Sequence, residues 1–175
     1  MNPYTSLQNY IISKKTISSY YIFLGIFLLL ISAICRFYNY NDSLFQGLFF
    51  GSLTFGILII LLGITYRNSN TKIFLSVEND YLNDRVIFLN KETLRMEKVL
   101  DNFSSFQTIF TLIIILAIGV IISFKIPYIS GVCIIISLLF SGILIIEAIL
   151  KSSIDQYYQE LQKAHSSNFI LEGLD

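Results

Sequence analysis

Glu147 is the residue whose type and position could most readily do chemistry in this sequence, because it lies in an otherwise uncharged apolar run, 129–150. A charge at the centre of a bilayer costs about 3 kcal/mol, so ionisable residues there generally have a function. Glu147 lies close to the end of the run, and Lys151 follows it. Two interpretations stay open: an ion pair between Glu147 and Lys151 at the membrane boundary, or a role for Glu147 in gating or an ion pathway.

The other residue types that catalysis needs are scarce or lie in the wrong places. His165 is the single histidine, and it lies outside the apolar runs, which contain no aspartate. Intramembrane proteases that use a histidine base or two aspartates are therefore excluded. The sequence also lacks HExxH and paired-cysteine zinc motifs, and its glycines form no phosphate-binding loop. We therefore expect no enzyme, no cofactor and no metal site, and His165 reads as a surface residue.

Four apolar runs must position these residues: 20–35, 44–66, 106–124 and 129–150. They are 16 to 23 residues long, which approaches or matches a ~30 Å hydrocarbon core at ~1.5 Å per residue. Only 14% of the residues are charged, against about a quarter in soluble domains. We expect an all-α, polytopic membrane protein with four transmembrane helices arranged as two hairpins.

The lysine and arginine residues predict the orientation of these hairpins. Ten of the 12 precede the first run, lie between the second and third, or follow the fourth; Arg36 and Lys125 lie on the opposite side. The positive-inside rule then places both termini in the cytoplasm, at a bacterial inner membrane. The net charge is zero, so we expect no nucleic-acid partner. The expected organisation is an N-terminal segment (1–19), a hairpin (20–66), a cytoplasmic helical segment (67–105), a second hairpin (106–150) and a C-terminal helix and tail (151–175).

The two loops on the opposite side are short, and their residues suit helix starts. Asp42 or Ser43 can cap the second helix, and Pro127 suits a sharp turn or a first helical position. Cys35 and Cys133 are expected at similar depth near these loops. Two buried apolar thiols are favoured there over a disulfide.

A heptad pattern follows the second run. The polar residues of Arg67–Thr71 predict a break in the helix. Ser76 is expected to cap a new helix, which continues without glycine or proline into the third span. Glu92 and Arg95 are expected to form a surface pair within this helix. Apolar residues recur there in steps of four and three, as in a coiled coil, with a polar defect at Thr93. The resulting seam consists of Leu82, Val86, Leu89, Met96, Leu100 and Phe103.

The fourth run continues in the same way, with a second seam beyond the membrane. Its residues are Leu150, Ile154, Tyr157 and Leu161. We therefore expect spans three and four to extend into a cytoplasmic, coiled-coil-like stalk. Two uses of the stalk stay open: a pair closed within one chain, or a surface for self-association or for docking a cytosolic partner.

Small residues indicate where helices approach closely. Gly47, Gly51 and Gly56 form a small-xxx-small pattern in the second span, which fits contacts within the bundle or between protomers. The string Gly56–Ile60 recurs as Gly142–Ile146. Either the hairpin is duplicated, or two isoleucine-rich helices match by composition.

The leading hypothesis is a non-enzymatic integral membrane protein that self-associates or docks a cytosolic partner through its stalk. Its expected partners are membrane lipid and either further copies of itself or a cytosolic protein. This layout suits a membrane effector or regulator of a bacterial defence or conflict system. The alternatives are an immunity protein against a pore-forming toxin, and a small channel or transporter subunit with Glu147 in its path.

Overall fold

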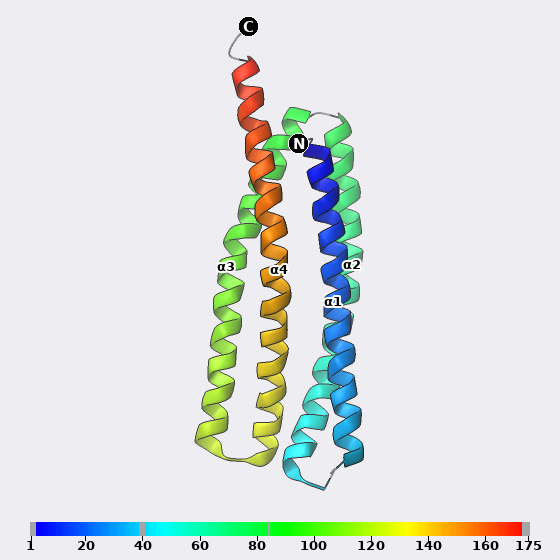
Figure 1. The fold of residues 1–175 in the computed structure, drawn as a ribbon, viewed down its shortest axis with the longest axis vertical. Coiled ribbons are helices and arrows are strands. Elements are labelled where there is room, and N and C mark those ends of the chain that lie inside the picture. The colour runs from blue at the N-terminus through cyan, green and yellow to red at the C-terminus, as the bar shows by residue number, and fades with distance from the viewer. Residues whose placement is uncertain (1–2, 39–40, 84, 173–175) are drawn as a thin grey trace.

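Every secondary-structure element in the described part of this computed structural model is a helix (Figure 1). The backbone is described for residues 3–38, 41–83 and 85–172, and the side chains in these ranges for all but residues 3–4, 72–76, 78–80, 82–83, 85 and 167–172. The helices are α1 (Pro3–Tyr38), α2 (Ser43–Asn83), α3 (Arg85–Phe124) and α4 (Pro127–Glu172).

All four helices are longer than a membrane is thick. They contain 36, 41, 40 and 46 residues, which at ~1.5 Å per residue is about 54 to 69 Å, against a ~30 Å hydrocarbon core. Each is long and apolar enough to cross a membrane, which confirms the predicted all-α class with four candidate spans. Because the surplus length occurs in every helix, the extension beyond the apolar runs includes α1 and α2 as well as α3 and α4.

The predicted polar break after the second run is wrong. The chain stays helical through Arg67–Thr71 as far as Asn83, and α3 begins only at Arg85. Two polar residues of this segment fit the helix: Thr71 Oγ1 donates to the Arg67 carbonyl at 3.1 Å, and Asn70 is buried near Tyr66. The predicted cap at Ser76 therefore lies inside α2.

The two short loops begin helices as the sequence predicts. Asp42 caps α2, because its Oδ1 accepts a hydrogen bond from the Leu44 amide at 2.9 Å. Pro127 is the first residue of α4, where its missing amide hydrogen costs nothing. Lys125 makes the turn before it with a φ of 49°.

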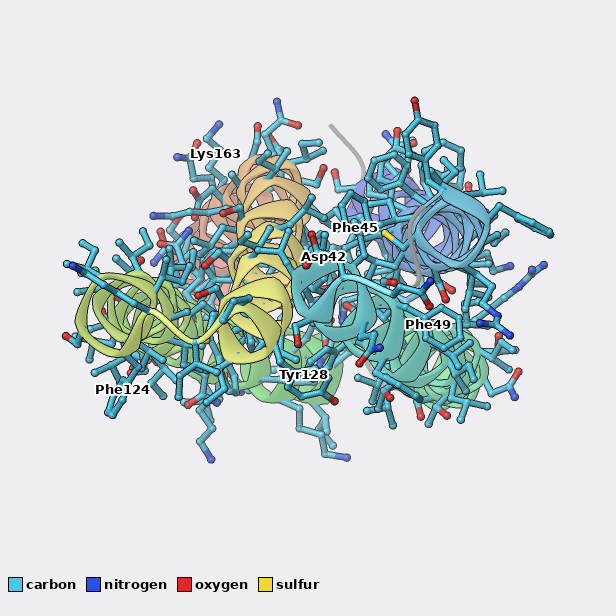
Figure 2. All side chains as sticks on the ribbon, turned by 90° about the horizontal axis from the view of Figure 1, so that it is seen from below. Asp42, Phe45, Phe49, Phe124, Tyr128 and Lys163 are labelled. Carbon is cyan, nitrogen blue, oxygen red and sulfur yellow. The ribbon has the colours of Figure 1, made fainter. Side chains whose placement is uncertain are left out.

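The helices form an open bundle rather than a closed one. The two short loops lie at one end, and the N-terminal end of α1 and the C-terminal end of α4 lie at the other (Figure 1). The most extensive contact joins α1 to α2, and α4 packs on both, whereas α3 contacts mainly α4. Seen from the loop end, α3 with Phe124 lies at one edge, separated by α4 from α2 with Phe45 and Phe49 (Figure 2).

Two buried clusters hold the bundle together. The cluster within the apolar runs centres on Leu28, Ile59, Ile135, Leu139 and Ile143. The larger cluster joins the extensions near the termini, and it includes residues of the predicted seams together with residues of α1. The core therefore continues from the apolar runs into the extensions.

Candidate functional site

The predicted seam on α3 lies inside the bundle from Leu89 onward. Leu89, Met96 and Phe103 are 2%, 0% and 6% exposed and belong to the cluster near the termini, with Leu100 partly buried against it. Val86 is instead 46% exposed. The Leu82 side chain lies outside the described residues. The partners of the seam come from α1 and α4: Leu7, Tyr10, Ile154, Tyr157 and Leu161.

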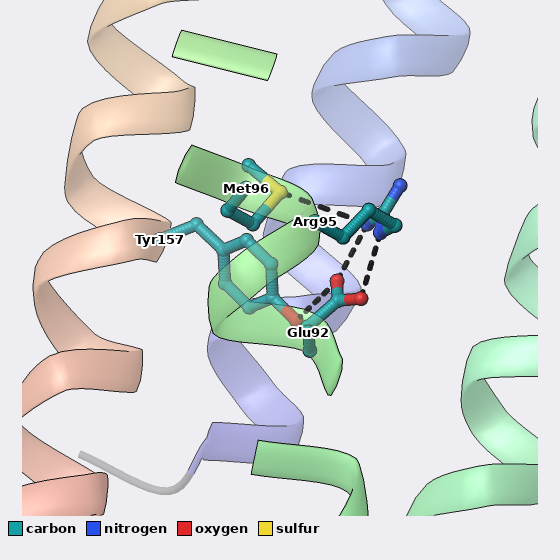
Figure 3. A network of polar contacts seen from close by, with 4 residues as sticks. All are labelled: Glu92, Arg95, Met96 and Tyr157. Carbon is teal, nitrogen blue, oxygen red and sulfur yellow. Dashed lines mark hydrogen bonds and ion pairs between the residues drawn. The ribbon is translucent and has the colours of Figure 1, made fainter. Parts of the chain in front are cut away.

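Glu92 and Arg95 form a buried pair, and the expected surface pair is wrong. Glu92 is 3% exposed, because α4 covers it. Arg95 Nε donates to Glu92 Oε2 at 2.7 Å, and the Tyr157 hydroxyl of α4 donates to Glu92 Oε1 at 3.0 Å (Figure 3). A buried carboxylate is tolerated only when such donors satisfy it. The network therefore fixes α3 against α4.

The network extends to α1 through an aromatic stack. The rings of Tyr10 and Tyr157 lie 4.8 Å apart and nearly parallel, and Lys14 Nζ lies 4.9 Å from the centre of the Tyr10 ring. The charge of Arg95 lies near Tyr10, although the buried Tyr10 hydroxyl has no hydrogen-bond partner. Three helices thus meet at one polar layer near the termini. Glu92 has its hydrogen-bond donors in this layer, and we interpret the layer as a structural contact between the three helices.

Glu147 forms a second polar layer at the end of the apolar runs. Its Oε1 accepts a hydrogen bond from the Tyr21 hydroxyl of α1 at 3.4 Å, whereas Oε2 is buried without a partner. Tyr21 in turn packs edge-on against Tyr66 of α2. The structure does not bring Glu147 and Lys151 together: no ion pair joins these two described residues, and Lys151 is exposed.

The glycines of α2 make close contacts within the chain. A Cβ at Gly47 would meet the Tyr128 backbone of α4, and one at Gly51 would lie against Ile135 of α4. A Cβ at Gly56 would meet the side chain of Leu29 in α1. All three predicted packing positions therefore serve the bundle of one chain.

The two glycines of the repeated string, Gly56 and Gly142, do not occupy equivalent places in their hairpins. Gly56 contacts α1, its neighbour in the same hairpin, and Gly142 also contacts α1, through Leu24, rather than its own neighbour α3. A duplicated hairpin with a twofold axis would give them equivalent partners. The packing at these positions therefore favours the compositional interpretation of the repeat.

The remaining candidate groups are the two cysteines and the histidine. Cys35 and Cys133 are both free and buried. His165 Nε2 lies 2.7 Å from Asn90 Oδ1, which ties the distal part of α4 to α3. Among the described residues, no group of three or more histidine, cysteine or carboxylate side chains could hold a metal ion.

Comparisons with protein-family models, curated proteins and solved structures find no match for this chain.

Sequence reasoning missed the feature that distinguishes α3. Only 6% of the residues in its most apolar stretch are buried, against 28–33% in the other three helices. Along its whole length α3 carries a second stripe with a seven-residue spacing, which is exposed: Ile87, Leu94, Asp101, Thr108, Ile115 and Ile122. That spacing was readable in the sequence, but the more apolar seam at Leu89 and Met96 masked it.

Proposed function

We propose that this chain is a non-enzymatic protein of a bacterial inner membrane that acts by self-association, with the exposed stripe of α3 as the contact between two copies. The observation that carries the proposal is the low burial of the most apolar stretch of α3, in which only 6% of the residues are buried. A membrane helix held by one neighbour has most of its surface free for another chain.

The two faces of α3 differ in what covers them. Residues two positions apart on a helix point about 200° apart, so the stripe through Ile87 and Leu94 lies opposite the seam through Leu89 and Met96. The seam is used within the chain, whereas Ile87 and Leu94 are 50% and 60% exposed outside the apolar runs. Large apolar residues at that spacing on a water-facing helix favour a coiled-coil contact with another chain.

Small and hydroxyl-bearing residues continue this face into the membrane. Thr108 and Thr111 are exposed, and their hydroxyls donate to carbonyls of their own helix, at Ser104 and Gln107. A Cβ at Gly119 would meet nothing within 4 Å. Glycine and threonine permit the close backbone approach on which helix association in lipid depends.

The partner that we propose for the exposed stripe of α3 is a second copy of this chain in parallel orientation. Both copies insert with the termini in the cytoplasm, because ten of the 12 lysine and arginine residues flank that side. A twofold axis along the membrane normal then brings the two α3 stripes together. The pair joins two bundles, each stiffened by its own Glu92 network, and gives a membrane regulator or effector a defined assembled state.

Cysteine cross-linking tests this contact directly. In a background with Cys35→Ser and Cys133→Ala, Ile115→Cys places a thiol on the stripe at 59% native exposure. Oxidation in native membranes should give a disulfide-linked species of twice the 20.1 kDa chain mass. The matched control is Ile57→Cys, at 48% exposure on α2, which should stay monomeric.

Equal cross-linking at the two positions would mean random collision in the membrane, and no cross-link at Ile115→Cys would remove the α3 contact. Either result counts against the proposal.

A further inference from the structure

An open cavity of about 390 Å³ is lined by residues of all four helices. Its walls come from Tyr21 on α1, Leu62 and Tyr66 on α2, Phe110 on α3 and Glu147 on α4. The side between α2 and α3 is the least closed, because these two helices make few contacts. The cavity is therefore accessible from the lipid rather than only from water.

The lining changes from apolar to polar along the bundle. On α2, Ile59 and Leu62 come first and Tyr66 and Ser69 follow toward the end that holds the termini. Ile59 and Ser69 are ten residues apart, about 15 Å on a helix and roughly half of a ~30 Å hydrocarbon core. This polarity matches one lipid of the leaflet nearer the termini, with its chain toward the bilayer centre.

Glu147 determines the chemistry of the polar end. Its Oε2 atom is buried and has no hydrogen-bond partner, and no ion pair joins Glu147 to a described lysine or arginine. A carboxylate out of water is costly unless a cation or several donors satisfy it. Tyr21 supplies the one hydrogen-bond donor that this carboxylate has among the described residues, so a charged donor from a ligand in the cavity would complete its partners.

We propose that this cavity binds a lipid with a primary ammonium headgroup, of the phosphatidylethanolamine type, whose ammonium donates to the Glu147 carboxylate. The acyl chain lies against Ile59, Leu62 and Phe110. Binding is non-covalent and independent of the association of α3 with a second copy.

Native mass spectrometry of the full chain in detergent tests the proposal, with equal amounts of phosphatidylethanolamine and phosphatidylglycerol added. Phosphatidylethanolamine should be retained preferentially, and Glu147→Gln should weaken its retention at least about tenfold, because a charge-assisted hydrogen bond is lost. Free ethanolamine, which carries the ammonium without a chain, should not compete for the site.

A second pair of variants tests the cavity without touching the carboxylate. Leu62→Trp fills the space from its lining and should lower phosphatidylethanolamine retention, whereas Leu61→Trp, at 55% native exposure outside the lining, should not. Equal retention of the two lipids by the wild type would overturn the proposal. So would undiminished retention in both Glu147→Gln and Leu62→Trp, or competition by ethanolamine alone.

Discussion

At the scale of single residues, Glu92 matters most to the fold because it is a carboxylate that is only 3% exposed. It accepts hydrogen bonds from Arg95 on its own helix and from Tyr157 on α4, and Tyr157 stacks on Tyr10 of α1. Breaking a buried pair costs more than the pair contributes, because the remaining charge keeps its burial without its partner. Removing different groups of the network should therefore lower the free energy of unfolding by different amounts.

Glu92→Ala should lower the free energy of unfolding by about 3 kcal/mol, because it leaves the half-buried Arg95 without its anion and the Tyr157 hydroxyl without its acceptor. Tyr157→Phe should cost only about 1 kcal/mol, since it removes one hydrogen bond and keeps the ring that stacks on Tyr10. Denaturation in detergent followed by far-ultraviolet circular dichroism measures both.

The control is Lys163→Ala, which removes an exposed ion pair with Glu160 and should change stability by less than about 0.5 kcal/mol. A cost for Glu92→Ala as small as that of the control would show that the network does not hold α3.

At the scale of elements, α3 combines a covered seam with an exposed stripe. The covered side fixes it to α4, and the exposed side continues from Ile87 to Ile122 across the membrane boundary. Asp101 is the one charged residue on the stripe. A polar residue at such a position sets register at a cost in stability, and in a parallel pair each Asp101 would face its counterpart.

Asp101→Leu should therefore strengthen self-association, with the dissociation constant in detergent falling about tenfold as like charges are removed and apolar area is added. Sedimentation equilibrium over a range of protein-to-detergent ratios gives this constant. The control variant Gln162→Leu adds a leucine at an exposed position of α4, and it should leave the dissociation constant unchanged. An unaltered constant in Asp101→Leu would place the contact elsewhere than on this stripe.

The sequence predicts well those features of the elements that local chemistry decides. The four apolar runs, the Asp42 cap and the Pro127 start depend on neighbouring residues, and the structure confirms them. The end of α2 was wrong because Asn70 finds its place in a helix through burial against Tyr66, which propensity does not encode. The burial of Glu92 depends on α4 crossing over it, and the cavity at Glu147 depends on all four helices. Neither arrangement is visible in one stretch of chain.

At the scale of the whole molecule, three helices pack closely and the fourth extends the bundle to one side. α1, α2 and α4 contact one another, with glycines at their closest approaches, while α3 touches mainly α4. Such a bundle is asymmetric, and a second copy applied to α3 would complete it around a twofold axis. In the proposed dimer, α3 lies at the centre and the pair is the functional unit.

The native mass of the detergent-solubilised protein tests this claim most directly, in the wild type and in Gly119→Leu. A side chain at Gly119 meets nothing within the chain, so the variant should keep its fold and lose only the contact between copies. The wild type should have twice the 20.1 kDa chain mass and Gly119→Leu the mass of one chain. Ala33→Leu, at an exposed position of α1, should stay dimeric. A monomeric wild type, or a Gly119→Leu variant as dimeric as the wild type, would contradict the account.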